Sequence, residues 1–384
     1  MPQAQRAGWT EGGEERSALW RSERGAPAPS KIVVVDDRIG AEEAYGLAAQ
    51  GVGLLWRGDY RNARQLLAAM AHRFERLAKR RSRGAPARPV AMADAFNAER
   101  RTRAQRARTL GMLLVPLEPD YSIPLRRAPD LRDAFAEVYG PATEPSVVSL
   151  RELLGIVGAH EWRRKGVEVP ALGARVHPHY GVFAPIRGEY VDLVADAPLP
   201  RALAAAPVAF DVGTGTGVLA AVLARRGIAR IVATDTEPRA IECARENLAR
   251  LGVAGAVELV RADLFPPGRA ALAVCNPPWV PARPSSPLEH GIYDPDSRML
   301  RGFLAGLGSH LVEGGEGWLV LSDLAERLGL RSRAELEQSF ARAGLRVLGR
   351  LDTRPGHPRA VDAEDPLHDA RREEVISLWR LAPG

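Results

Sequence analysis

A regular alternation of strand-like and helix-like segments between residues 207 and 381 restricts the fold of this chain more than any other feature. The expected strands are 207–213, 229–235, 257–263, 272–276, 317–323, 345–351 and 374–381. Helical segments lie between them; one of these, 238–252, has Pro238 in its first turn and Gly252 at its end, as helices commonly do. Strands that alternate with helices of this length predict an α/β fold with a seven-stranded, largely parallel sheet covered by helices on both faces.

The preceding residues divide into three stretches. Residues 1–30 lack periodicity and end in GAPAPS, so we expect a disordered leader. Residues 31–170 are predicted to form an N-terminal, mainly helical and basic domain, and residues 171–200 a hairpin or linker before the alternating domain, 201–384. Within the N-terminal domain the apolar spacing predicts a strand at 31–35 and helices near 60–77, 95–109, 129–139 and 146–164.

Composition argues against several classes of protein. Cys243 and Cys275 have no CxxC or Cys/His pattern around them, which excludes a disulfide framework and a zinc motif and predicts a cytoplasmic protein without a bound metal. No apolar run of about 18 residues is present that could cross a membrane. The net charge is +6, and residues 73–108 alone contain twelve basic and three acidic residues. This segment could contact the phosphates of a nucleic acid, or it could be a solvated pair of arginine-rich helices.

A glycine-rich turn, FDVGTGTG, follows the first strand of the alternating domain and precedes a helix. Gly213, Gly215 and Gly217 follow a GxGxG spacing, which differs from the dinucleotide and phosphate-loop patterns and lets a ligand approach the backbone closely. Acidic residues close three successive strands. Asp211 could accept hydrogen bonds from the ammonium group of a ligand, and Asp235 could accept them from both hydroxyls of a ribose. Asp263 could lie near an adenine amine.

Together, this turn and these three carboxylates predict a pocket for S-adenosylmethionine. The cofactor-binding residues that we expect are Asp211, Gly213, Thr214, Gly215, Gly217, Asp235, Thr236, Asp263, Leu264 and Asn276.

The sequence Asn276-Pro277-Pro278-Trp279 ends the fourth strand and is predicted to be catalytic. The nitrogen of an amide or an aromatic amine is a poor nucleophile because its lone pair is delocalised. The Asn276 side-chain oxygen and the Pro277 carbonyl could each accept one N–H of the target and aim the nitrogen at a methyl donor. Proline lacks an N–H and fixes φ, so these acceptors stay in place, and Trp279 offers a flat face for stacking.

These motifs resemble those of class I S-adenosylmethionine-dependent N-methyltransferases, and above all of the HemK-like protein glutamine N5-methyltransferases. The resemblance covers residues 175–350 and implies a seven-stranded Rossmann-like class I methyltransferase sheet with an N-terminal substrate-recognition domain. It also implies substrate contacts from the linker and the motif, namely Tyr180, Phe183, Arg187 and Trp279.

The macromolecule that accepts the methyl group stays open at this point. A protein glutamine is favoured by the overall resemblance, and the N6 amine of adenine in RNA or DNA by the basic segment 73–108. A module that has lost activity and only binds nucleic acid or regulates a partner is the alternative that is not an enzyme. The cluster of His177, His179 and Tyr180 could touch substrate, but packing of the linker is the favoured interpretation.

Overall fold

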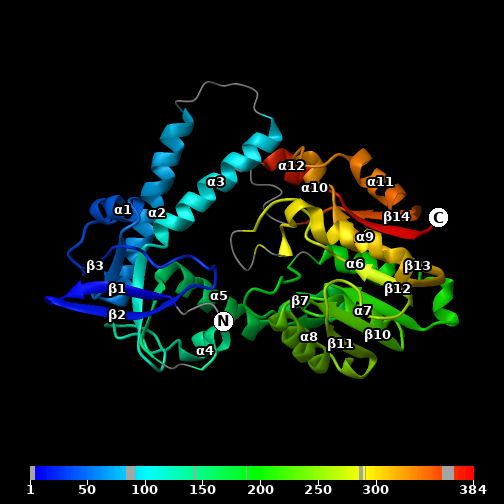
Figure 1. Cartoon of the computed structure of the whole chain (residues 1–384), viewed down its shortest axis with the longest axis horizontal. Helices are drawn as coiled ribbons and strands as arrows, with labels where there is room; N and C mark the ends of the chain where they lie inside the picture. Colours follow the sequence, from blue (N-terminus) through cyan, green and yellow to red (C-terminus); the bar gives the residue numbers. More distant parts are fainter. Residues whose placement is uncertain are drawn as a thin grey trace. The chain divides into compact units, whose positions relative to one another are not determined.

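The chain forms two compact units, each with its own sheet (Figure 1). The structure is a computed structural model that describes residues 5–83, 91–141, 144–186, 188–284, 289, 291–356 and 367–384. The first unit comprises Met1–Val90 and Asn97–Glu161, and the second Ala91–Phe96 and Trp162–Gly384. Among the described residues, no helix combines the length and the apolar character needed to cross a membrane.

A six-stranded sheet in the order β1-β2-β6-β5-β4-β3 forms the centre of the first unit. Its strands are β1 (Arg6–Glu11), β2 (Glu14–Arg21), β3 (Ile32–Val35), β4 (Gly53–Trp56), β5 (Leu113–Leu117) and β6 (Ser146–Ser149). The helices of this part of the chain are α1 (Ala41–Ala49), α2 (Tyr60–Arg83), α3 (Met92–Leu110), α4 (Arg132–Tyr139) and α5 (Leu150–Lys165).

The prediction of a disordered leader over residues 1–30 was wrong for the segment that forms β1 and β2. These strands pair in an antiparallel hairpin that turns at Gly12 and Gly13, both with positive φ (63° and 85°). Ala7 and Trp9 alternate with exposed residues and are buried in a small core together with Ala18 of β2. Two glycines between alternating segments are a hairpin signal, which the many charged residues on the exposed face obscured.

Helices account for more of residues 31–170 than strands do, as predicted, but the region also contains β4, β5 and β6, which were not predicted. The helix expected to begin at residue 146 is preceded by β6, which lies between β2 and β5 and consists of the sequence SVVS. Valine side chains suit a buried strand better than a helix. The strand at 31–35 and the helices near 60–77, 95–109 and 129–139 are confirmed by β3, α2, α3 and α4.

The second unit contains the predicted seven-stranded sheet, in the order β11-β10-β9-β12-β13-β15-β14. Its strands are β9 (Val208–Val212), β10 (Arg230–Asp235), β11 (Val257–Arg261), β12 (Ala270–Cys275), β13 (Leu311–Ser322), β14 (Leu345–Thr353) and β15 (Ile376–Pro383). Its helices are α6 (Glu189–Asp196), α7 (Val218–Arg225), α8 (Pro238–Arg250), α9 (Arg298–His310), α10 (Leu324–Arg327), α11 (Arg333–Arg342) and α12 (His368–Arg372). The strands from β11 to β13 are parallel, and β15 runs antiparallel to both of its neighbours.

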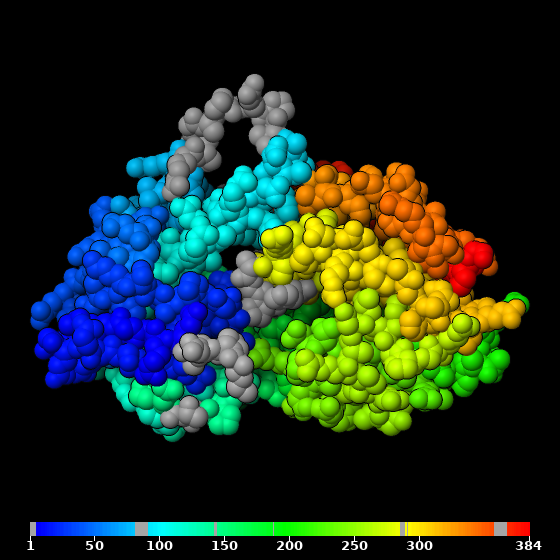
Figure 2. Space-filling view, viewed as in Figure 1, coloured from blue at the N-terminus to red at the C-terminus, as the bar shows by residue number. Residues whose placement is uncertain are grey.

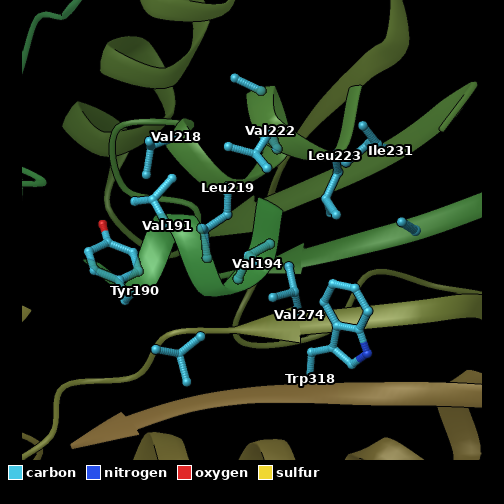
Figure 3. Close-up of a cluster of buried hydrophobic side chains, with 14 of the residues drawn as sticks. Tyr190, Val191, Val194, Val218, Leu219, Val222, Leu223, Ile231, Val274 and Trp318 are labelled. Carbon is cyan, nitrogen blue, oxygen red and sulfur yellow. The ribbon is translucent and has the colours of Figure 1, made fainter. Parts of the chain in front are cut away.

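Helices cover both faces of this sheet. On one face Tyr190 and Val191 of α6 pack with side chains of α7 over Val274 and Trp318 of the sheet (Figure 3). On the other face Phe303 of α9 and Phe340 of α11 belong to a second buried cluster. Because both faces are covered, the strands are apolar throughout, as in the wholly buried β12.

The segment between the two sheets contains a two-stranded hairpin, β7 (Val167–Val169) and β8 (Ala174–Val176), which is antiparallel. It begins a few residues before the predicted linker, 171–200. The helix α6 follows within that range and contributes to the core of the second unit. The linker is therefore part of the packed second unit.

Candidate active site

The glycine-rich turn connects β9 to α7 at the carboxyl edge of the sheet. Gly213, Gly215 and Gly217 all have positive φ (76°, 53° and 80°), a conformation that residues with a Cβ rarely adopt. The N–H groups of Gly213 and Thr214 donate to the carbonyl of Thr234, at 2.9 and 2.8 Å, and so hold the turn against the end of β10. A Cβ at Gly215 would meet no atom within 4 Å, so this side of the turn is open to a ligand.

Asp211 is buried at the base of the turn, with 1% of its surface exposed. Its Oδ2 accepts from the Thr214 hydroxyl (2.7 Å) and from the N–H of Ala220 (3.0 Å). Burial raises the pKa of this carboxyl to about 6, although the two hydrogen bonds oppose the change. Within the described part of the chain Asp211 has no cationic partner, and a ligand ammonium would offset the cost of ionising it.

Asp235 ends β10, as predicted, and lies beside the turn. Its Oδ2 accepts from the N–H of Gly215 and its Oδ1 from that of Glu237, both at 3.0 Å. Burial raises its pKa as well. Each oxygen keeps one lone pair, so the carboxylate could still accept from two ribose hydroxyls. Thr236, the next residue, is exposed.

Asp263 lies two residues beyond the end of β11, on the surface. It forms an ion pair with Arg298 at the start of α9 (2.5 Å). The neighbouring Leu264 has a positive φ of 70°, which is rare for a leucine, and its carbonyl accepts from the Thr234 hydroxyl (2.5 Å). A Cβ at Gly302 would collide with the side chain of Leu264, so the glycine in α9 makes room for this leucine.

The Asn276-Pro277-Pro278-Trp279 segment follows β12, next to the strand that leads into the glycine-rich turn. Cys275 pairs with Val212 in the parallel register of β12 and β9, so both loops leave the same edge of the sheet side by side. Pro277 is buried, whereas Asn276, Pro278 and Trp279 are partly buried. The indole N–H of Trp279 donates to Oδ1 of Asn276 at 2.8 Å.

The chain then folds back on itself to close this corner. Val280 forms an isolated bridge with Tyr293, and the N–H of Asp294 donates to the Val280 carbonyl (2.9 Å). The buried Asp294 accepts from the N–H groups of Met299 (3.0 Å) and Leu300 (3.1 Å), which are free at the beginning of α9. Our sequence interpretation missed this acidic cap, although an aspartate shortly before an apolar helix is a recognisable start signal.

Met299 was also missed. Its terminal methyl group lies where a Cβ on Gly213 would stand, so the two would collide. The Met299 side chain, which extends from α9, thus covers the glycine-rich turn. Position 213 is therefore restricted to glycine for two reasons, this contact and its positive φ.

The linker contributes two of the predicted substrate residues to this region. Phe183 packs against Gly291, in the loop that follows the Asn-Pro-Pro-Trp segment, because a Cβ at that glycine would lie 2.6 Å from the phenylalanine. Tyr180 lies under the guanidinium of Arg239, 5.7 Å from the ring centre, at the start of α8. Arg187 lies outside the described residues.

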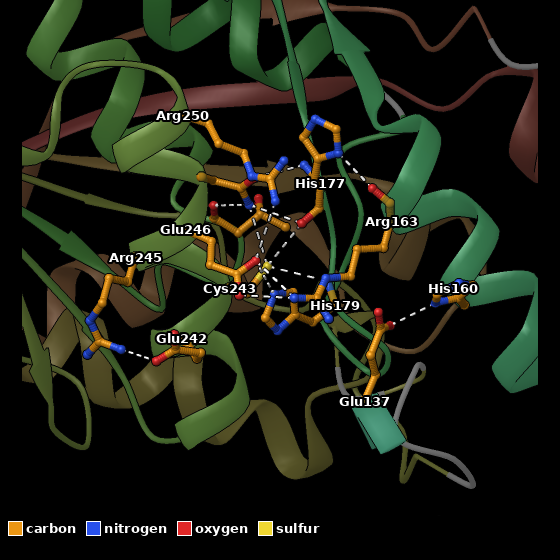
Figure 4. A network of polar contacts seen from close by, with 12 residues as sticks. Glu137, His160, Arg163, His177, His179, Glu242, Cys243, Arg245, Glu246 and Arg250 are labelled. Carbon is orange, nitrogen blue, oxygen red and sulfur yellow. Dashed lines mark hydrogen bonds and ion pairs between the residues drawn. The ribbon is translucent and has the colours of Figure 1, made fainter. Parts of the chain in front are cut away.

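The histidine cluster of the linker packs against α8, which confirms the favoured interpretation (Figure 4). The nearly buried His179 donates from Nε2 to Glu246 (3.1 Å), and Nδ1 of His177 donates to the carbonyl of Arg163 (2.6 Å). The Cys243 thiol donates to the His177 carbonyl at 3.5 Å, and burial raises the pKa of this thiol to about 12. Both cysteines are buried and free.

Asn247 of α8 connects this linker to the glycine-rich turn. Its Oδ1 accepts from the N–H of His177 (2.8 Å), and its Nδ2 donates to the carbonyls of Thr216 (3.1 Å) and His177 (3.3 Å). The residue is 1% exposed. One buried amide therefore fixes the turn and the linker relative to each other.

Residues 174–345 match the model of the methyltransferase small domain family. The release factor glutamine methyltransferase of Cereibacter sphaeroides is 35% identical over 170 residues, which are 41% of this chain and 59% of that protein. The ribosomal protein L11 methyltransferase of Pelotomaculum thermopropionicum is 49% identical over 69 residues, 17% of this chain and 22% of that protein. The chain thus spans less than two thirds of the length of these relatives. A solved ribosomal protein L11 methylase from Lactobacillus delbrueckii covers 52% of this chain and 82% of its own, with 20% identity and a TM-score of 0.35.

The strand order, the glycine-rich turn and the family match define the class: the second unit carries a class I methyltransferase domain, whose cofactor is S-adenosylmethionine. Within this class the domain is similar to release factor glutamine methyltransferases, which are among the relatives that it matches. The resemblance inferred from the sequence is thereby confirmed.

Proposed function

We propose that this protein methylates a planar amide nitrogen of a macromolecule, with the side chain of a protein glutamine as the leading acceptor. The observation that carries the proposal is the position of Asn276 at the end of β12, beside the end of β9 from which the glycine-rich turn departs. An amide acceptor and a cofactor turn at adjacent strand ends could bring a nitrogen and a methyl donor together.

The residues of the turn fit S-adenosylmethionine. Asp211 is a buried carboxylate with no cationic partner among the described residues, which suits the ammonium group of the ligand. Gly215 leaves open space above the backbone, and Asp235 retains accepting capacity for a ribose. The cofactor supplies an electrophilic methyl group bound to a sulfonium sulfur.

The chain's own residues orient the acceptor. The Asn276 side-chain oxygen and the Pro277 carbonyl accept hydrogen bonds from the two N–H groups of the target amide. These hydrogen bonds reduce the delocalisation of the lone pair on the amide nitrogen. Pro277 and Pro278 fix two successive φ angles, so these acceptors do not need to reorganise during the reaction. The first unit and the linker residues Tyr180 and Phe183 would then recognise the macromolecule, as would Arg187.

The acceptor class is tested by labelling. Cell extract is incubated with the protein and methyl-tritiated S-adenosylmethionine, and is then digested separately with RNase, DNase and protease. We expect the label to survive both nucleases and to be lost with protease. Strong acid should release it as volatile methylamine, because hydrolysis of an N-methyl amide gives that product. Label that only a nuclease removes would exclude the glutamine proposal, and absence of label from all fractions would favour an inactive binding module.

The N6 amine of adenine in RNA or DNA is the second candidate, and the surface of α2 and α3 favours it. These helices lie at the surface in Figure 2, coloured light blue to cyan. Their exposed arginines are Arg61, Arg64, Arg76, Arg80, Arg101, Arg103 and Arg108. Of these arginines, Arg103 forms an ion pair with Glu99, and the neighbouring Arg106 pairs with Glu75 (3.2 Å).

Salt dependence tests this second candidate. If α2 and α3 bind a nucleic-acid backbone, the affinity for a single-stranded, adenine-containing RNA will fall steeply with salt, and the removal of one arginine–phosphate pair should reduce the logarithmic slope by about 0.7. Changing both Arg76 and Arg80 to Gln should lower the slope, whereas Arg346→Gln, on exposed β14, should not. Equal salt-dependence slopes for the unchanged protein and both variants would show that nucleic acid does not bind this surface.

A further inference from the structure

We propose that Trp279 is a positioning residue whose indole N–H determines which end of the Asn276 side-chain amide faces the acceptor nitrogen. The inference rests on the proposed function, because it assigns to Trp279 a task within that reaction. It adds to the stacking role expected from the sequence a hydrogen bond that the sequence did not predict.

The hydrogen bond distinguishes the two orientations of the asparagine amide. Nε1 of Trp279 lies 2.8 Å from Oδ1 of Asn276. An indole nitrogen only donates, and Oδ1 is the only side-chain atom of asparagine that accepts. Rotating the amide by about 180° would set its NH₂ group against the indole N–H, two donors facing each other. Trp279 therefore selects the orientation in which the oxygen, and not the nitrogen, occupies this position.

The indole itself is held firmly. Trp279 packs against hydrophobic clusters on both faces of the sheet and against a third that contains Val280 and Tyr293. The ring of the buried Tyr190 meets it edge-on, with centroids 6.5 Å apart and an angle of 86° between the planes. A donor on a ring fixed in this way does not follow the asparagine if the amide rotates.

Selecting the oxygen matters because the target nitrogen also carries N–H groups. Oδ1 has two lone pairs, and Trp279 uses one, so the second remains for an N–H of the acceptor. With the amide reversed, its NH₂ group would face the N–H groups of the target. An NH₂ group is a donor, so it could not accept a hydrogen bond from either of them. Without the indole N–H both orientations become populated, and a fraction of the molecules is unproductive.

The decisive comparison uses Trp279→Phe with and without Asn276→Asp. Phenylalanine keeps an aromatic ring and loses the N–H, so tritium transfer to the protein fraction of the extract should slow by about fivefold, the worth of one ordinary hydrogen bond. Affinity for S-adenosylmethionine should stay unchanged. An aspartate has two equivalent oxygens and no orientation to select. In the Asn276→Asp background, Trp279→Phe should therefore alter the rate by less than about twofold.

If Trp279 only packs, Trp279→Phe will slow both backgrounds by the same factor, and the proposal is wrong. The melting temperatures of the variants show whether the packing of the ring has been disturbed.

A second measurement needs no methyl transfer. The full chain is labelled with ¹⁵N-tryptophan, and the Trp279 indole resonance is identified among the seven tryptophans by its absence in Trp279→Phe. We expect slow exchange of this proton with solvent, faster exchange in Asn276→Ala, and protection retained in Asn276→Asp. Unchanged exchange in Asn276→Ala would overturn the inference even if the enzyme is active. If the protein transfers no label at all, the proposed function fails while this measurement still decides the role of Trp279.

Discussion

Asp211 and Asn276 are polar residues at the ends of two neighbouring strands, and their surroundings differ. Asp211 is buried beneath the glycine-rich turn, where desolvation disfavours its charge, whereas Asn276 is partly exposed and neutral. The first is suited to a fixed cationic group of the cofactor, and the second to a target that arrives and leaves. Substitutions at the two positions should therefore affect different properties.

Replacing Asn276 by Ala should abolish most turnover and weaken cofactor binding far less, although Asn276 was also expected to contact the cofactor. In the proposed reaction the change removes one of the two acceptors for the target N–H groups, which we expect to cost about a hundredfold or more in rate. Calorimetry with S-adenosylmethionine and the tritium assay measure the two effects. Asn97→Ala, at an exposed position of α3, is the matched control. Full activity in Asn276→Ala would contradict its assigned role.

Asp211 should make the stability of the free protein depend on pH. Its folded pKa is about 6, above the unfolded value of about 3.9, so the folded state binds the proton more tightly. The free energy of unfolding should therefore fall as the pH rises from about 4 to 6, by on the order of 3 kcal/mol from this group. Denaturant titrations between these pH values, compared with Asp211→Asn, isolate the contribution. A difference between the two proteins that does not vary with pH would contradict it.

At the scale of elements, α8 connects two loops of the candidate site through one residue. Asn247 satisfies the N–H of His177 and the carbonyls of His177 and Thr216. Because Thr216 belongs to the glycine-rich turn and His177 to the linker, the position of both loops depends on this helix.

Asn247→Ala should leave these buried groups without partners and lower the free energy of unfolding by about 1–3 kcal/mol. It should also weaken the binding of S-adenosylmethionine, because the turn is no longer held. Glu242→Ala, which removes an exposed ion pair with Arg245 on the same helix, should do neither. Urea unfolding and calorimetry measure the two quantities. Equal effects of the two substitutions would show that Asn247 does not hold the turn.

The seven strands of the second sheet were predictable because apolar strands, glycine turns and helix ends all agree there. Position 211 could be assigned to a strand end from its sequence neighbours alone. The hairpin of β1 and β2 was missed because its exposed face is charged, and β6 because its four residues directly precede a helix. The hydrogen bond between Trp279 and Asn276 could not be predicted, because it depends on how the ring packs against distant parts of the chain.

At the scale of the whole molecule, the second unit is discontinuous in sequence. Its residues Ala91–Phe96 precede the main part by more than sixty positions. Phe96 is 4% exposed and packs edge-on against Tyr293, 6.4 Å between ring centroids, in a cluster with Val280, Leu328 and Leu367. This cluster adjoins the Asn-Pro-Pro-Trp segment, since Trp279 packs against it as well.

Phe96→Ala should therefore destabilise the second unit by about 3 kcal/mol or more, as large truncations in a core do. Asp94→Ala, on an exposed face of the same helix turn, should have little effect. A fragment of residues 162–384 should resemble Phe96→Ala in its lower melting temperature and should bind an apolar dye at the uncovered cluster. A fragment as stable as the whole chain would show that Phe96 is dispensable.

The segment Ala91–Phe96, which is separated in sequence from the rest of the second unit, also limits how the gene can recombine. A single genetic crossover between codons 161 and 162 would join a foreign N-terminal half to a catalytic half that lacks its phenylalanine. Exchange of the N-terminal half between homologous genes would then require either two crossovers or a donor that carries an equivalent aromatic residue.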